Sequence, residues 1–171
     1  HPGTELRLTN AEERMSITIR HYIGRSRAYV FLVGIPQGRE AETQPAVDRY
    51  FQSIVLDRSD APSATGTGRF DASASHWRFL FPPEGYFAID LPGDPVRTEG
   101  SMRIDDHAYD VWTYSLEGST PGISIEVSSI FFGSRRPDGV TAALDERGAL
   151  PGGAIIRRHD GARGGQAMRR L

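Results

Sequence analysis

The sequence predicts an α+β domain in which helices pack on an antiparallel sheet of about six to eight strands. Apolar and polar residues alternate in several segments, which is typical of strands with one buried face. These segments occur both before and after a single segment with the pattern of an amphipathic helix. Most connections between these segments have the length of hairpin turns. The 171 residues, of which 38% are hydrophobic, fit one domain of ordinary size.

The N-terminal third predicts three strands. TELRL at 4–8 is a short strand. In MSITIRHYI at 15–23, every second residue belongs to an apolar face that includes His21, so we expect a half-buried strand with a buried histidine. AYVFLVGI at 28–35 is apolar on both faces, which predicts a central strand covered on both sides.

A helix is predicted in ETQPAVDRYFQSIVL at 42–56. Pro45 fits its first turn, where the missing N–H costs no hydrogen bond. Apolar side chains recur at the spacing of one helix face, at Val47, Tyr50, Phe51 and Ile54. We therefore expect this helix to pack on the sheet.

The second half returns to strands after a connector. Residues 58–75 are rich in Ser, Ala, Gly and Thr without periodicity, which predicts a linker or long loop. Strands are then predicted at 76–81, 86–91, 109–116 and 123–130, with a polar hairpin before the third. A short helix follows Asp138, and AIIRR with QAMRRL predicts a last hairpin.

Five segments follow the motifs of a known repeat fold in a rearranged order. They are PPEGYFAIDLPGDP (82–95), HPGTEL (1–6), DGARGGQAM (160–168), RAYVFLVGIP (27–36) and RYFQSIVLD (49–57). The pattern resembles bacterial repeat proteins of the PsbP-like fold, which a eukaryotic Ran-binding factor of the Mog type shares. In such a domain the segment containing LPGDP comes first, whereas here it comes second.

The resemblance implies a division of the chain. Residues 1–57 correspond to the back half of a PsbP-like repeat, 58–75 to a linker, and 76–171 to the front half of a repeat. The chain is then a fragment of a tandem array, a permuted domain closed from its two halves, or a swapped homodimer. Because it begins His-Pro-Gly without Met or a signal peptide, we expect it to be processed or cut from something longer.

No feature of the chain predicts an enzyme or a cofactor. There is no cysteine, which excludes disulfides and thiolate catalysis. A net charge of −2 gives no general attraction for nucleic acid, and no segment is apolar enough to predict a membrane span. All 20 basic residues are arginine, which we ascribe to a GC-rich bacterial genome.

One carboxylate–imidazole cluster stands out, at Asp105, Asp106 and His107 with Asp110 close by. Its oxygens suit a hard cation, so a cation-binding or small-molecule-binding module that uses the Asp105–Asp110 turn is the alternative function. Asp is also a common turn former, and the cluster lies between two predicted strands.

Aromatic and arginine residues are the candidates for partner binding. Trp77, Phe79 and Phe81 alternate beside the linker, and Arg157 and Arg158 form a basic pair. They either complete the core or form a docking surface. We expect a non-catalytic, extracytoplasmic (periplasmic) protein that docks onto a larger assembly. The resemblance implies, as one concrete version, an extrinsic subunit of a membrane-bound photosynthetic or electron-transfer complex.

Overall fold

The computed structural model describes residues 3–10, 14–56, 77–83, 86–117, 123–148 and 153–160. Within these ranges, the side chains of 117, 146–148 and 153–160 are not described.

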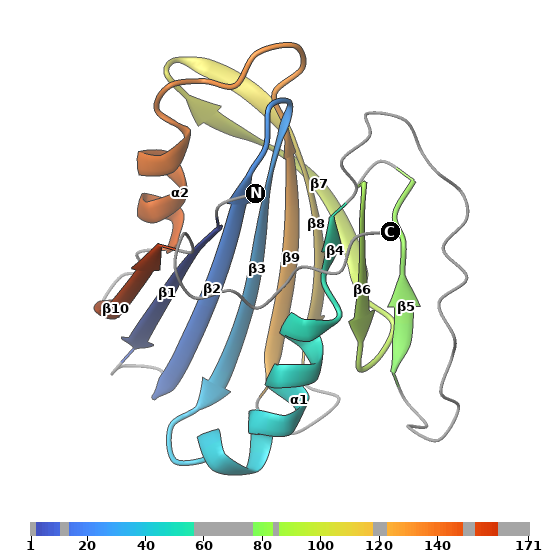
Figure 1. Cartoon of the computed structure of the whole chain (residues 1–171), viewed down its shortest axis with the longest axis vertical. Coiled ribbons are helices and arrows are strands. Elements are labelled where there is room, and N and C mark those ends of the chain that lie inside the picture. Colours follow the sequence, from blue (N-terminus) through green and yellow to red (C-terminus); the bar gives the residue numbers. More distant parts are fainter. Residues whose placement is uncertain are drawn as a thin grey trace.

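Most of the described chain forms antiparallel sheet (Figure 1), and the predicted α+β class is confirmed. Seven strands form the main sheet, in the spatial order β10 (Gly153–Asp160), β1 (Gly3–Asn10), β2 (Met15–Ile23), β3 (Arg27–Pro36), β9 (Ser124–Phe131), β8 (His107–Glu117) and β7 (Val96–Ile104). Three short strands form a small sheet, in the order β4 (Val55–Leu56), β6 (Phe87–Leu91) and β5 (Arg78–Leu80).

The two sides of the 58–75 connector meet in the middle of the main sheet. β3 pairs antiparallel with β9, from Arg27 opposite Phe131 to Gly34 opposite Ser124. In the small sheet, β4 pairs with β6. Strands from both sides of the connector therefore share the same two sheets.

Burial along β2 and β3 confirms the predictions for these strands. On β2, Ile17, Ile19 and His21 are buried and the residues between them are only partly buried. His21 is 2% exposed, as expected of a core histidine. β3 is buried on both faces, because it lies in the centre of the main sheet with side chains packed on either side.

The helix α1 (Glu40–Gln52) begins earlier than its sequence pattern predicts. The prediction that Pro45 lies in the first turn is wrong, because Pro45 falls inside the helix. Glu40 fixes the earlier start: its carboxylate accepts hydrogen bonds from the Gly38 N–H (2.7 Å) and the Ser16 hydroxyl (2.8 Å). Val47, Tyr50 and Phe51 of the predicted stripe are buried on the helix. The predicted extension to residue 56 is wrong, because the helix ends at Gln52 and Ile54, although buried, lies beyond it.

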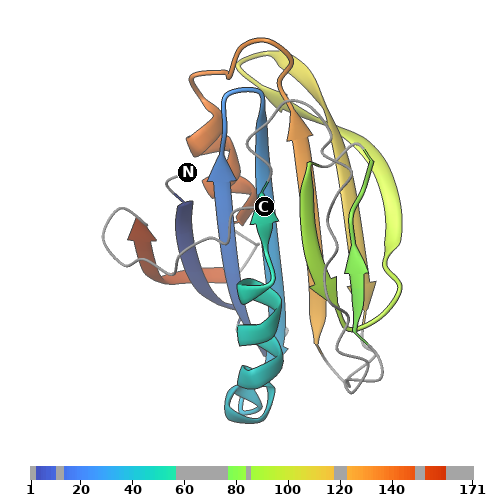
Figure 2. The same ribbon diagram turned by 45° about the vertical axis from the view of Figure 1, so that its right-hand side comes forward.

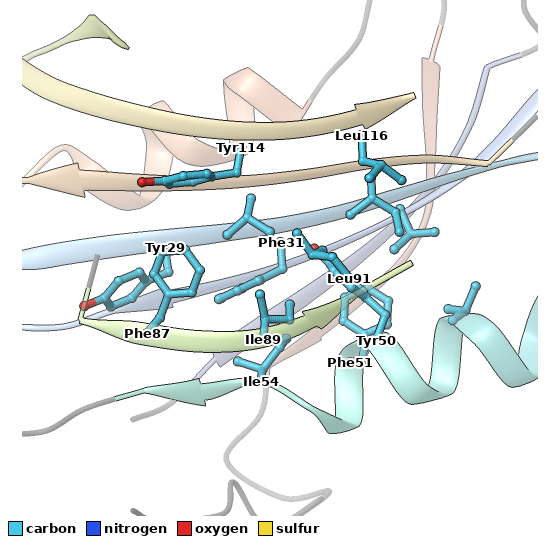
Figure 3. Packing of buried hydrophobic residues seen from close by; sticks show 14 of the residues in the cluster. Tyr29, Phe31, Tyr50, Phe51, Ile54, Phe87, Ile89, Leu91, Tyr114 and Leu116 are labelled. Carbon is cyan, nitrogen blue, oxygen red and sulfur yellow. The ribbon is translucent and has the colours of Figure 1, made fainter. Parts of the chain in front are cut away.

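The main sheet is covered on both faces (Figure 2). One face packs against α1 and the small sheet. On the other face α2 (Val140–Gly148) packs through Val140 and Leu144. Figure 3 shows Phe87, Ile89 and Leu91 of β6 within the first of these cores, close to Phe31 of β3.

Two predicted hairpins have different outcomes. The polar hairpin before 109–116 is present as β7 and β8, joined by a turn at Asp105 and Asp106. AIIRR lies in β10, which pairs with β1, whereas QAMRRL lies outside the described residues.

Candidate docking site

An apolar pocket opens between α1 and one end of the main sheet, beside Trp77. Its volume is about 70 Å³. The described residues that line it are mostly aliphatic or aromatic: Val33, Ala46, Val47, Tyr50, Trp77, Pro92, Leu116, Ile123 and Ile125. We call this the Trp77 pocket.

Trp77 forms a wall of the pocket, and its ring is contacted by Arg49 of α1. The guanidinium carbon of Arg49 lies 4.5 Å from the centre of its ring, a cation–π contact. Arg49 is also 3.6 Å from the carboxylate of Asp90 on β6. Since the Asp90 N–H donates to the Ser53 hydroxyl (2.9 Å) at the end of α1, the helix and the small sheet are joined here. A charged pair, Arg49 and Asp90, therefore lies beside the tryptophan that walls the pocket.

Tyr50 closes the pocket from the core side. Its side chain is fully buried, and its hydroxyl donates to the Glu126 carbonyl oxygen on β9 (3.2 Å). Burial raises the pKa of Tyr50 well above its ordinary value, and the nearby Glu126 carboxylate raises it further. The phenol therefore stays neutral and acts as a hydrogen-bond donor.

The three aromatic residues proposed from the sequence differ in their surroundings. Trp77 packs against the core that contains α1 and the small sheet. Phe79 is opposite Asp90 in the β5–β6 ladder, so these two side chains point to the same face of the small sheet. Phe81 lies just beyond β5 and is 39% exposed.

The proposed arginine pair lies on another element. Arg157 and Arg158 are in β10, at one edge of the main sheet, where their backbones pair with Arg7 and Leu6 of β1. Their side chains are outside the described part of the chain. Among the described residues that line the Trp77 pocket, none belongs to β10, so the arginine pair and the pocket lie on different strands.

A second aromatic cluster surrounds Arg27 at the start of β3. The guanidinium carbon of Arg27 lies 4.4 Å from the ring centre of Tyr86, 4.5 Å from that of Phe131 and 5.9 Å from that of Trp112. Phe131 is 37% exposed. Sequence analysis missed this cluster because its residues come from four separate segments. The β3–β9 register places Arg27 opposite Phe131, which brings two of these segments together.

The cluster at Asp105, Asp106 and His107 has a structural explanation. Both aspartates have positive φ, 48° and 62°, as a type I′ hairpin turn requires. The Asp105 carboxylate accepts a hydrogen bond from the Gly139 N–H (2.9 Å), just before α2. His107 Nδ1 lies 2.8 Å from the Asp105 carbonyl oxygen. Among the residues that the structure describes, no group of three metal-ligating side chains is arranged to hold a metal ion.

Comparison with known proteins does not assign the chain to a family. No family model matches it, and neither a curated protein nor a solved structure does so. Among the described helices, none combines the length and the apolar character needed to cross a bilayer.

Proposed function

We propose that this chain is a non-catalytic interaction module that docks onto a larger protein assembly through the Trp77 pocket. The observation that carries the proposal is an apolar pocket walled by a tryptophan, whose ring contacts an arginine that is paired with an aspartate. Strong protein interfaces concentrate their binding energy in such places, where an apolar anchor is surrounded by polar groups that exclude water.

The size of the pocket favours a protein partner over a metabolite. Pockets for drug-sized ligands measure roughly 300–1,000 Å³, and a cavity of roughly 150 Å³ holds one benzene. The Trp77 pocket, at about 70 Å³, is smaller than either. It suits one small aliphatic side chain, and the rest of the partner would lie across the Arg49–Asp90 pair beside Trp77.

The setting of this docking is also part of the proposal. The motifs resemble those of a PsbP-like repeat, in a rearranged order, and an antiparallel α+β architecture is compatible with this fold. Proteins of that fold serve as accessory subunits on photosynthetic membranes. We therefore propose an extracytoplasmic location and an extrinsic position on a membrane-bound complex.

Filling the pocket tests the proposal. Ala46 lines the pocket, whereas Ala41 is exposed on the same helix. Ala46→Met places a flexible apolar side chain at the site where the partner's anchor would bind, and Ala41→Met is the matched control. Each tagged full-length protein would be purified from its own cells and its complexes separated by size under native conditions.

We expect the wild type and Ala41→Met to co-purify with the same partner in a fixed ratio, and Ala46→Met to lose it while its thermal unfolding is unchanged. Equal co-purification with all three proteins would refute docking at the pocket. A wild type that elutes without any stoichiometric partner would refute the docking function itself.

A further inference from the structure

The edge strand β7 differs from the other three sheet edges. Natural sheets protect their edges with short strands or with bulges. β4 and β5, at the edges of the small sheet, have two and three residues. The ladder between β10 and β1 contains an irregularity at Arg7 and Leu8. β7 has nine residues and an uninterrupted ladder to β8, its only partner among the described strands.

Neither face of β7 is covered over most of its length. The six consecutive residues from Val96 to Ser101 are all exposed, and Val96 is 66% exposed. Because successive side chains point to opposite faces, this run of exposure means that both faces are open. In Figure 2 the strand runs along the outer margin of the main sheet. A second extended strand can therefore approach its free edge.

The charges and the length of β7 together select one way of pairing with a second copy of the same strand. Two antiparallel copies related by a two-fold axis place each residue opposite another from the same face of the sheet. Arg97, Glu99 and Arg103 all lie on one face. With the axis at Ser101, Glu99 of each copy lies opposite Arg103 of the other, which gives two complementary charge pairs.

The neighbouring registers place like charges together. An axis at Glu99 puts the two Glu99 carboxylates opposite each other, and an axis at Gly100 puts Arg97 opposite Arg103. An axis at Met102 puts Glu99 opposite Asp105. Like charges directly opposite each other in a sheet are unfavourable. The register centred on Ser101 avoids all three conflicts and overlaps residues 98–104. An axis at Thr98 also places Arg97 opposite Glu99, but it overlaps only residues 96–100 of the strand.

Two details of the structure fit this register. Arg103 makes no ion pair within the described part of the chain, whereas Glu99 already binds Arg97 at 2.7 Å. A carboxylate has acceptor sites for two guanidinium groups, so Glu99 can keep Arg97 and add Arg103 of the second copy. On the opposite face, Met102 would lie across from Gly100, where a Cβ would meet no atom within 4 Å.

We infer that β7 is a homodimerisation edge at which two copies pair antiparallel about Ser101 to form one continuous sheet. This differs from docking at the Trp77 pocket, which is in another part of the fold. It also differs from a swapped dimer, because each chain keeps its own β3–β9 pairing.

Charge reversal on the full chain tests the inference. Glu99→Arg and Arg103→Glu each create two like-charge pairs at the axis, so we expect each variant alone to raise the dimer dissociation constant at least about tenfold. Mixing the two variants makes both pairs complementary in the heterodimer. We therefore expect the mixture, and also the double variant, to dimerise about as well as the wild type.

Sedimentation velocity over a micromolar concentration series would measure these constants. Glu42→Arg, on the exposed surface of α1, controls for the change in net charge. Wild-type dimers should also weaken as salt is raised. A monomeric wild type across the series would overturn the inference. So would a dimer that both single variants leave unchanged, which is the result a swapped dimer gives. Trp77→Ala should leave dimerisation intact, so failure of the docking proposal would not affect this result.

Discussion

At the scale of single residues, Tyr50 connects the pocket to the stability of the core. Its phenol is fully buried and donates to a backbone carbonyl, so the folded protein keeps it protonated. The unfolded chain ionises tyrosine at a pKa of about 10. Because folding raises the pKa of Tyr50, its contribution to stability is complete below about pH 10 and is lost as the pH rises above that value.

Replacing Tyr50 by phenylalanine should separate the contribution of its hydrogen bond from that of its buried ionisable phenol. Near neutral pH, Tyr50→Phe loses one hydrogen bond and should reduce the free energy of unfolding by about 1 kcal/mol. Above about pH 10 the variant should lose stability with pH less steeply than the wild type, because it has no phenol to ionise at this site. Urea unfolding at several pH values would measure both. Parallel curves for the two proteins above pH 10 would contradict the role given to burial.

At the scale of elements, Pro45 imposes a measurable cost on α1. It is exposed inside the helix, where a residue with an N–H would bond to the carbonyl of Ala41. A proline inside a helix destabilises it by about 3 kcal/mol relative to alanine. Proline also lowers the conformational entropy of the unfolded chain, which offsets roughly 0.4–1 kcal/mol of that cost. We therefore expect Pro45→Ala to stabilise the protein by about 2 kcal/mol in chemical unfolding. A lower unfolding midpoint for this variant would show that the helix does not continue through residue 45.

The start of α2 depends on the turn between β7 and β8. Asp105 caps this helix from 34 positions earlier in the chain through the Gly139 N–H. Asp105→Ala removes the acceptor and places alanine at positive φ, so it should cost about 1–2 kcal/mol. Asp105→Asn keeps an acceptor oxygen and tolerates this backbone conformation, so it should cost less. Equal losses in thermal unfolding for the two variants would argue against the cap.

These elements also show what could be predicted from the sequence. Alternation along β2 and apolar residues on both faces of β3 were sufficient to predict their burial, because that pattern is local. The start of α1 was missed because Glu40 is fixed by Ser16, a contact between distant segments. The Arg27 cluster was missed for the same reason. Trp77 lines the pocket, whereas the partner-binding role predicted for Trp77, Phe79 and Phe81 stays a prediction.

At the scale of the whole molecule, the fold depends on both sides of the 58–75 connector. β3 and β9 pair in the centre of the main sheet, and the core around Phe31 includes Phe87 and Val127 from beyond the connector. We expect a chain cut at a protease site inserted in 58–75 to remain a folded complex of two pieces. Co-elution of the pieces with an unchanged circular dichroism spectrum would support this. Separation into two independently folded pieces would contradict it.

Docking at the Trp77 pocket can be tested most directly by footprinting, because the chain has no cysteine. Ala46→Cys places a single thiol in the pocket wall, and Ala41→Cys places one on the exposed side of the same helix. The measurement is the rate at which a small alkylating reagent labels each thiol, in the free protein and in the purified complex with its partner. We predict that complex formation slows labelling at position 46 and leaves position 41 unchanged. Labelling at position 46 that is as fast in the complex as in the free protein would contradict docking at this pocket.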